Sequence, residues 1–249
     1  MKNRILDQII RSMALVKKDV MIYYFKGPVV MMGVLLPAIM FISFAFGRGM
    51  AFETLMPGLI GVSVFFTCSA ISPVAFPWET SQRTLERLIS APVAIWTILF
   101  GDMLASALVG IIVSIVPIVI ALGFGVTFTS PLMLAFAVIV GSVCFATMAL
   151  LISIPPVSSP QYTQMLSALT KFPLLFISGV FIPLSNLPEA ARAISFISPL
   201  TYFTDIARYA TGHGSYLPLY LDFLAIIAFT FVFWVGAVRF HNKTLPLRV

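Results

Sequence analysis

Charged side chains are scarce in this chain of 249 residues. Asp, Glu, Lys and Arg make up 10% of it, whereas 60% of the residues are hydrophobic and the mean hydropathy is +1.05. Soluble domains carry roughly 25% charged residues, and a soluble protein of this size could not cover so much apolar surface with polar groups. The composition therefore excludes an ordinary soluble domain. It favours one membrane domain, residues 1–249, without an appended soluble catalytic domain.

Cysteine is nearly absent, and the common catalytic motifs are wholly absent. Cys68 and Cys144 both lie in apolar runs, so we expect small buried side chains and no disulfide framework. No phosphate-binding loop occurs, because the only Lys followed by Ser or Thr is Lys243, and Asn242 precedes it where Gly is required. HExxH, CxxC and GxSxG are missing as well. We therefore expect no catalytic residue, metal site or cofactor site in this chain.

Hydrophobic periodicity predicts an all-α integral membrane fold. Residues 3–26 are amphipathic, with Ile5, Ile9 and Met13 on one face and Arg4 on another. We expect this helix to lie in the membrane interface; the alternative is a surface helix of a soluble lobe. Largely uncharged stretches approach the ~20 residues that a ~30 Å hydrocarbon core requires. They predict six transmembrane helices: 28–46, 54–78, 96–122, 132–154, 165–182 and 217–238.

The basic residues predict the orientation of these spans. With the amino terminus inside, twelve Lys and Arg residues lie on the inner side, Lys171 among them, and three lie outside: Arg48, Arg192 and Arg208. The positive-inside rule therefore predicts a multi-pass protein with both termini in the cytoplasm. A net charge of +6 would indicate nucleic-acid binding in a soluble protein. Here it is assigned to orientation, and we expect no nucleic-acid partner.

Two acidic residues fall near the ends of predicted spans. Asp102 lies near the inner end of span 96–122, and Asp222 near the outer end of span 217–238. Intramembrane acids are functional candidates by default. Because both residues lie within a turn or two of an interface, snorkelling or a local ion pair is the alternative.

The inner loop, residues 79–91, is expected to contain a short helix that ends at Pro92. Glu79 and Arg83 are spaced as a favourable i,i+4 ion pair, and Leu85 and Leu88 lie on an apolar edge. A rigid charged helix between two spans can press into a groove on a soluble partner. The alternative is a solvated connector.

The polar outer segment, residues 183–215, is expected to contain two short helices. Asn186 is a candidate N-cap, and Glu189 completes a capping box. Ser198 can cap a second helix with Pro199 at its first position. Helices of ~11–13 residues are ~16–20 Å long, which is too short to span. We therefore expect a re-entrant pair that dips into the outer leaflet, sheltered by protein or water.

Both segments resemble those of the permease subunits of type-2 ABC exporters. The inner loop matches a family pattern of an acidic residue, Thr-Leu-Glu, Leu and Pro, here at positions 79, 84–86, 88 and 92. The outer segment is similar to the pattern Ser-Gly-Val-Phe-x-Pro, Leu-Pro, Pro-Leu-Thr-Tyr and a later Arg, here at positions 178–183, 187–188, 199–202 and 208. The resemblance covers essentially the whole chain. It departs from the family at Arg83, where Gly is usual, and at Asp102, where a basic residue is frequent.

The resemblance implies a transport subunit of an ATP-driven ABC exporter in the cell membrane, and not an enzyme. It implies cytoplasmic ABC ATPase subunits as partners, and these subunits bind ATP and Mg²⁺. The other implied partners are a second permease, expected to be an identical copy, and membrane lipid. Family cargo is amphipathic or polymeric: a drug, a lipid or a lipid-linked glycan. A largely apolar and aromatic pathway favours lipid-like or drug-like cargo here.

The resemblance also assigns roles along the chain. Residues 1–27 correspond to the elbow helix, and spans two and five to the dimer interface and pathway. The contact with the ATPase, the coupling helix, comprises Glu79, Arg83, Thr84, Leu85, Glu86, Arg87 and Leu88. The extracytoplasmic gate comprises Pro183, Leu187, Pro188, Pro199, Tyr202 and Arg208.

Two other classes remain open from the residues alone. An intramembrane enzyme needs convergent polar groups within the membrane, and the 68 uncharged residues from Met103 to Thr170 argue against it. A stand-alone channel or carrier usually has paired intramembrane charges or helices broken at the midplane, and the sequence indicates neither. Export over import, and a homodimer over a heterodimer, follow only from the resemblance.

Overall fold

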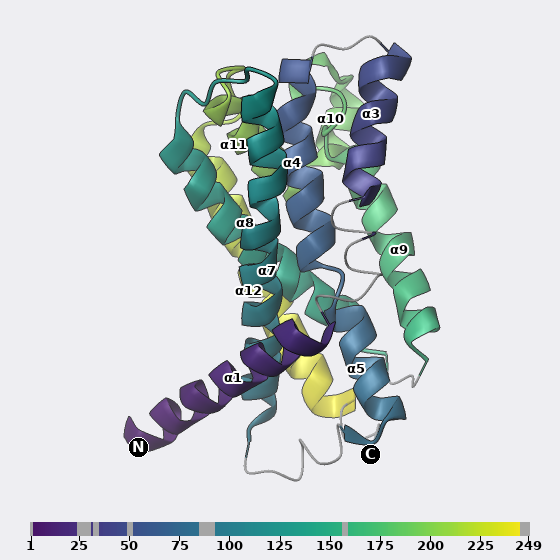
Figure 1. Ribbon diagram of the computed structural model, residues 1–249, viewed down its shortest axis with the longest axis vertical. Coiled ribbons are helices and arrows are strands. Elements are labelled where there is room, and N and C mark those ends of the chain that lie inside the picture. The colour runs from purple at the N-terminus through teal and green to yellow at the C-terminus, as the bar shows by residue number, and fades with distance from the viewer. Residues whose placement is uncertain are drawn as a thin grey trace.

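A computed structural model describes residues 2–23, 31, 35–48, 52–84, 93–155 and 159–244 of the chain. This part of the protein is all helical and contains no strand. The helices form an elongated bundle, and helix α1, Lys2–Tyr23, runs obliquely across its lower end (Figure 1). The predicted fold class is therefore confirmed at the level of an all-α protein.

Four helical stretches of the described chain are long and apolar enough to cross a membrane. They are Glu53–Ser81, Ile95–Gly123 (α7), Pro131–Ile152 (α8) and Leu219–Thr244 (α12). All four coincide with predicted spans, at 54–78, 96–122, 132–154 and 217–238. Because an uncharged apolar helix satisfies its own backbone, this signal can be read locally in the sequence.

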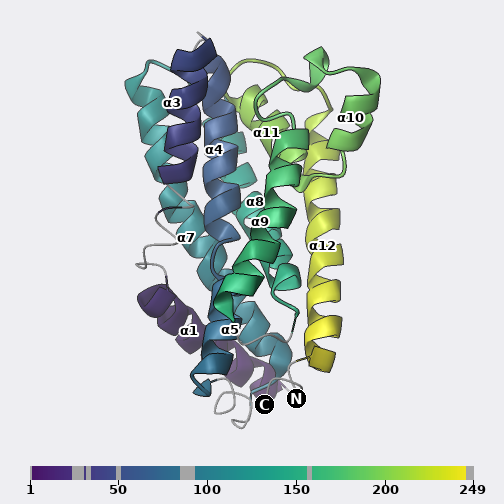
Figure 2. The same cartoon turned by 90° about the vertical axis from the view of Figure 1, so that its right-hand side faces the viewer.

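The other two predicted spans correspond to helices that run along the same bundle (Figure 2). They are α3, Leu36–Arg48, and α9, Pro160–Ile177. Residues 28–30 and 32–34 of the first predicted span lie outside the described residues, so six spans remain a prediction. Helix α9 begins and ends five residues before the predicted span 165–182. It starts earlier because Pro160 is a suitable first-turn residue.

The second span is broken, which the sequence analysis did not predict. It consists of α4, Phe52–Cys68, and α5, Ser72–Ser81, separated by residues 69–71. Pro73 lies in the first turn of α5. Proline has no N–H, and its ring clashes with the carbonyl four residues earlier, here that of Ser69. Our expectation that no span is interrupted was therefore wrong.

Two glycines allow helix α11, Pro199–Ala210, to pack closely inside the bundle. A Cβ atom on Gly141 of α8 would lie 2.5 Å from the ring of Phe203 of α11, and one on Gly61 of α4 would lie 2.9 Å from Thr204. Phe203 also contacts Phe145, with 5.8 Å between ring centroids. These contacts hold α11 against α4 and α8 at the upper end of the bundle.

The outer segment differs from the predicted pair of equal helices. Helix α10, Glu189–Ser195, has 7 residues, and Pro188 occupies its N-cap position. Asn186 instead ends a short 3₁₀ turn, Leu184–Asn186, so the predicted capping box is wrong. The second helix does begin at Pro199 after Ser198, as predicted. Helix α10 starts at Glu189 because the fixed φ of Pro188 sets the amino-terminal boundary of this short helix.

Helices α10 and α11 lie at the end of the bundle opposite to α1, α5 and the last turn of α12 (Figures 1 and 2). Residues 79–84, the described part of the predicted inner loop, and the predicted outer segment are thus at opposite ends of the molecule.

Candidate functional site

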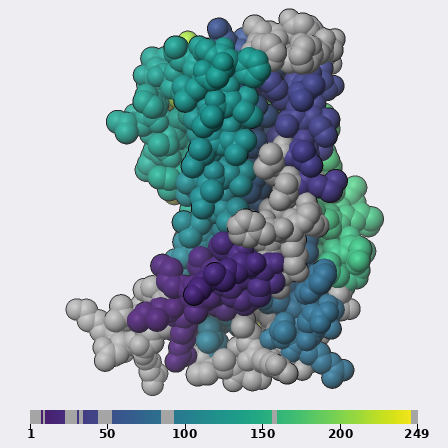
Figure 3. Space-filling model, viewed as in Figure 1, coloured from purple at the N-terminus to yellow at the C-terminus, as the bar shows by residue number. Residues whose placement is uncertain are grey.

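Helix α1 binds both ends of the inner loop. On one side Lys18 of α1 donates a hydrogen bond to Glu79 in the last turns of α5. On the other side the Gln8 side-chain oxygen accepts hydrogen bonds from the Ala94 N–H at 3.3 Å and the Thr97 hydroxyl at 2.7 Å, at the start of α7. Figure 3 shows α1 lying across α7, with α5 at its side. One interfacial helix therefore joins the two elements that enter and leave the loop.

The contact between α1 and α5 belongs to a buried polar cluster, which we call the inner junction: Lys18, Asp19, Ser72, Glu79 and Asp102. Lys18 lies 3.1 Å from the Asp19 carboxylate, and Ser72 donates to Asp102 at 2.5 Å. Asp19, Glu79 and Asp102 are 4%, 7% and 3% exposed. Lys18 thus pairs with two acids, and Asp102 pairs with Ser72, where α1, α5 and α7 meet.

Burial and neighbouring charges together set the pKa values of the two α1 residues in this cluster, Lys18 and Asp19. It raises the pKa of the Asp19 carboxyl to about 6, against the opposing effect of Lys18. Burial lowers the pKa of Lys18, but the neighbouring Asp19 and Glu79 carboxylates outweigh it and leave that pKa above its ordinary value. Lys18 therefore remains a cation at neutral pH and compensates part of the buried negative charge.

The structure divides the predicted coupling helix. Glu79 is part of α5 and is buried against α1, whereas Arg83 and Thr84 follow the helix and are exposed. The Thr84 hydroxyl donates to the Glu79 carbonyl at 3.2 Å. The remaining predicted contact residues lie outside the described residues: Leu85, Glu86, Arg87 and Leu88. Glu79 thus faces the inner junction and not the surface that a partner would touch.

Arg83 has a backbone conformation that favours the glycine usual in the family pattern. Its φ of 53° is the only positive value at a residue other than glycine in the described chain. A left-handed residue just past a helix end is usually glycine, because a Cβ atom is strained there. The usual family glycine at this position therefore fits the turn better than Arg83 does.

At the opposite end, Arg208 of α11 holds the turn that follows α9. Its guanidinium donates to the Gly179 and Val180 carbonyls at 2.8 and 3.1 Å. Gly179 has φ 73°, a conformation that favours glycine. The predicted gate residue Arg208 is therefore a backbone clamp in this structure, and it is only 8% exposed.

Two further charged residues organise the outer segment. Arg192 of α10 donates to the Leu184 and Leu187 carbonyls at 3.0 and 2.8 Å. The Asp205 carboxylate accepts hydrogen bonds from the Tyr216 and Leu217 N–H groups at 2.9 and 2.8 Å. Burial raises the pKa of Asp205, and these backbone donors oppose the shift. Neither residue belongs to the family pattern quoted for the outer segment, and nothing in the sequence indicated that they bind backbone.

The other predicted gate residues lie around the same segment without forming one cluster. Pro188 and Pro199 begin α10 and α11. Leu187 lines an outer apolar groove with Phe176, Phe181 and Ile194, whereas Pro183 lines a polar one with Asp205 and Arg208. Tyr202 points its hydroxyl back to the Phe196 carbonyl at 2.9 Å. These residues therefore lie in one segment but do not converge on one site: the prolines mark helix starts, and Tyr202 bonds to the backbone.

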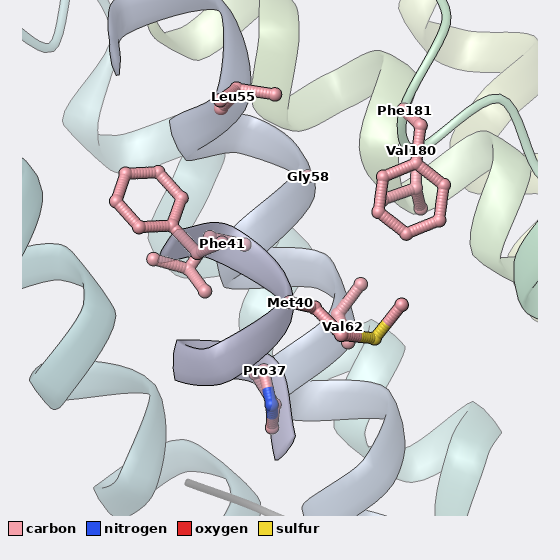
Figure 4. A pocket seen from close by; sticks show the side chains of 9 residues that line it. Pro37, Met40, Phe41, Leu55, Gly58, Val62, Val180 and Phe181 are labelled. Atoms are coloured by element: carbon pink, nitrogen blue, oxygen red, sulfur yellow. The ribbon is translucent and has the colours of Figure 1, made fainter. Parts of the chain in front are cut away.

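A second apolar groove lies between α3, α4 and the turn after α9 (Figure 4). Met40 and Phe41 of α3 face Leu55 and Val62 of α4, with Val180 and Phe181 across the opening. Gly58 also lines it, and a Cβ atom there would lie 2.7 Å from the Val180 carbonyl oxygen, so α4 packs closely against this turn. The groove therefore touches the turn that Arg208 holds.

Two further ionisable residues are buried within helices, and Asp222 lies in the first turn of α12, at the predicted outer end of that span. Lys171, counted above as an inner basic residue, is 2% exposed and lies within α9. Removing it leaves eleven inner against three outer basic residues, so the orientation argument stands. Asp222 is fully buried, and neither carboxyl oxygen has a hydrogen-bond partner among the described residues. Neither residue belongs to the inner junction or the outer segment.

These features define a class of protein. Within the described residues no group of three or more His, Cys, Asp or Glu could hold a metal ion. Apolar helices connect a polar junction at one end with a backbone-clamped segment at the other. Several helices long and apolar enough to cross a membrane, packed in one bundle, are typical of a polytopic membrane protein.

The comparison with known families agrees with this class. Residues 11–211 match the ABC-2 type transporter family, and the chain belongs to that family. It is a transport permease of the ABC type, and the ATPase activity of such a transporter lies in a separate subunit.

Individual relatives support the same assignment. The chain is similar to the inner membrane transport permease YadH of Escherichia coli, with 27% identity over 74% of this chain and 72% of the relative. It is also similar to the probable multidrug ABC transporter permease YbhR of E. coli, with 25% identity over 61% of this chain and 42% of the relative. Nodulation protein J of Rhizobium meliloti is 28% identical over 62% of this chain and 59% of the relative.

Proposed function

We propose that this permease is the membrane subunit of an ATP-driven exporter that moves an amphipathic drug, a lipid or a lipid-linked glycan out of the cell. Two cytoplasmic ATPase subunits bind ATP and Mg²⁺ and act on residues 79–91. Both termini are cytoplasmic, and the outer segment, residues 183–215, faces the other side.

The contact of α1 with both ends of the inner loop supports this proposal most directly. The loop enters from α5 through Glu79 and leaves into α7 near Ala94, and α1 binds at both points. A partner that presses on the loop therefore moves α5, α7 and α1 together. A solvated connector has no need for such bracing.

The apolar surfaces support amphipathic cargo and a second permease copy. The groove at Met40, Leu55 and Phe181 is apolar and touches the outer turn. Helix α9 exposes large apolar side chains at Met165 (56%) and Leu169 (64%), which suit contact with lipid or with a second copy. The predicted interface role of span two is not supported in the same way, because α4 and α5 are mostly covered within the chain.

The break between α4 and α5 is a feature that the stand-alone carrier alternative leads one to expect. A carrier works without an ATPase, whereas the family assigns the chain to an ABC transporter. Copurification and transport measurements can decide between an ABC permease and a stand-alone carrier.

The test is to purify the tagged chain from its native membrane in mild detergent and identify the proteins that accompany it. We expect an ATPase with a phosphate-binding loop, ATP hydrolysis by the complex, and none by the chain freed of partners. Vesicles containing the complex should move a fluorescent phospholipid or an amphipathic dye only with ATP. ATP-independent transport by the chain alone would establish the carrier instead.

A further inference from the structure

Lys171 makes an unusual contact in the interior of the bundle. It is the twelfth residue of α9, ~16 Å along the helix from Pro160 at 1.5 Å per residue, and is 2% exposed. Its amino group donates to the Ser69 carbonyl at 2.6 Å and lies 5.9 Å from the centre of the Phe66 ring. No carboxylate within the described residues forms a salt bridge with it. Its partner is therefore the backbone at the break in span two.

The sequence explains why the Ser69 carbonyl is available. In a continuous α-helix this carbonyl would accept the N–H of the residue four positions later. That residue is Pro73, which has no N–H. An unpaired backbone carbonyl inside a membrane protein is unfavourable. The Lys171 amino group supplies the missing donor from another helix.

The two halves of span two share the neighbours α7 and α8 but differ in the others. Helix α4 packs against α7, α11, α8 and α3, whereas α5 packs against α9, α8 and α7. Helix α4 thus contacts α11 of the outer segment, whereas α5 contains Glu79 and precedes the inner loop. Lys171 of α9 binds where these two halves meet.

From this geometry we infer that residues 69–71 form a hinge between the two halves of span two, and that Lys171 is the positioning residue that holds it. The inference rests on the proposed function, because the movement that crosses the hinge is the one produced by the ATPase partner at residues 79–91. A side-chain amino group can keep its bond to Ser69 through a change of helix angle that an i,i+4 backbone bond would resist.

Buried hydroxyl groups beside the hinge fit two arrangements of this region. Thr67, two residues before Ser69, and Ser167, one turn before Lys171 on α9, have hydroxyls without a hydrogen-bond partner in the described part of the chain. Buried polar groups in a settled structure are almost always paired. A second hinge angle would give these groups a chance to pair.

The first experiment tests the bond, using the intact complex in lipid nanodiscs. Lys171→Met should raise the unfolding equilibrium constant ~10-fold, because it leaves the Ser69 carbonyl unpaired. Pro73→Ala restores an N–H opposite that carbonyl, so Pro73→Ala with Lys171→Met should recover most of the loss. Pro117→Ala, which removes a proline from α7, is the matched control and should not rescue Lys171→Met. Equal effects of the two proline variants would overturn the inference.

The second experiment separates a hinge from a structural contact. If Lys171 only satisfies a carbonyl, the Pro73→Ala/Lys171→Met variant should regain both stability and ATP-driven transport of the fluorescent phospholipid or dye. If the break is a hinge, this variant should regain stability while transport stays at least ~10-fold below wild type. Recovery of transport would overturn the inference.

A third measurement does not depend on transport. Spin labels at Glu53 and Ser81, both exposed and at the two ends of span two, report its end-to-end distance in the wild-type complex and in the Pro73→Ala complex. The hinge predicts a broader or ATP-dependent distance distribution in wild type and a single narrow one in Pro73→Ala. Identical distributions would overturn the hinge even if transport is confirmed. Absent transport with a mobile wild-type span would overturn only the proposed function.

Discussion

Lys18 of α1 pairs with Glu79 of α5, although 61 positions separate them in the chain. The pair lies beside Asp19 and Asp102 and joins the amino-terminal helix to the element that leads into the inner loop.

Removing Lys18 should leave the buried acids Asp19 and Glu79 without their cation. We expect Lys18→Met to lower the free energy of unfolding by ~2 kcal/mol, because a buried charge that loses its partner is strongly unfavourable. Adding Glu79→Gln should return more than half of that loss. Denaturant unfolding of the purified protein measures both. Lys17→Met, at an exposed neighbour, should change stability by within ~0.5 kcal/mol. An additive double variant would show that Lys18 and Glu79 do not interact.

Arg83 should tolerate replacement by glycine unusually well. Its φ of 53° strains any residue with a Cβ atom, so Arg83→Gly should raise the free energy of unfolding by ~1 kcal/mol. Ser81→Gly, at the last residue of α5, should lower it by ~0.5–1 kcal/mol, because glycine is unfavourable within a helix. Thermal unfolding of the three proteins side by side checks the opposite signs. The same sign for both variants would contradict the assigned turn.

Gly101 should not accept a side chain. A Cβ atom there would lie 2.8 Å from the Leu15 Cβ atom and 3.1 Å from the Ser12 carbonyl oxygen, so Gly101→Leu must displace α1 from α7. We expect a loss of ~1–3 kcal/mol in stability. Gly123→Leu is the control, because nothing lies within 4 Å of its added Cβ. Unfolding midpoints in nanodiscs distinguish the two, and a stable Gly101→Leu protein would contradict the close packing of α1.

The two ends of the bundle should face opposite sides of the membrane. The basis is the excess of basic residues at the inner positions. Single cysteines at Asn3 and Leu187 should react with a membrane-impermeant thiol reagent from opposite faces of sealed vesicles. The native Cys68 and Cys144 are buried and serve as the unlabelled background. Labelling of both new cysteines from one face would refute the topology.

Charge reversal in the inner loop should uncouple transport without unfolding the protein. Glu86→Lys with Arg87→Glu opposes the charges that a complementary groove on the ATPase would read, and such changes cost ~2–5 kcal/mol in binding. We expect transport by the reconstituted complex to fall at least ~10-fold, while the amount of protein in the membrane is unchanged. Glu53→Lys, exposed at the opposite end, should have no such effect. Normal transport by the double variant would make residues 79–91 a connector.

Local sequence patterns predicted the elements whose cause is local. Helix α7, Ile95–Gly123, matches the predicted span 96–122, because a long apolar run fixes its own hydrogen bonds in lipid. Ser198 and Pro199 likewise placed the start of α11 correctly. At Asn186 two local signals competed, and Pro188 set the start of α10 instead of the capping box. The break at Ser69 was also encoded locally, by Pro73, but hydropathy does not report backbone hydrogen bonds.

The partners of the polar groups required the tertiary structure. Glu79 has a favourable local partner in the sequence, Arg83, yet it pairs with Lys18. Lys171 appears in the sequence as an inner basic residue, yet it donates to the Ser69 carbonyl, 102 positions away.

The chain's own sequence therefore determined that it lies in a membrane, where its long apolar helices run and which end is basic, because these follow from the local balance of apolar and charged side chains. Only the tertiary structure decided that Gln8 and Lys18 bind the ends of the inner loop, that Arg208 holds the outer turn and that Lys171 binds the break. The physical reason is that a hydrogen bond acts over ~3 Å. Its partner is chosen by the packing of helices far apart in the chain, which no local pattern contains.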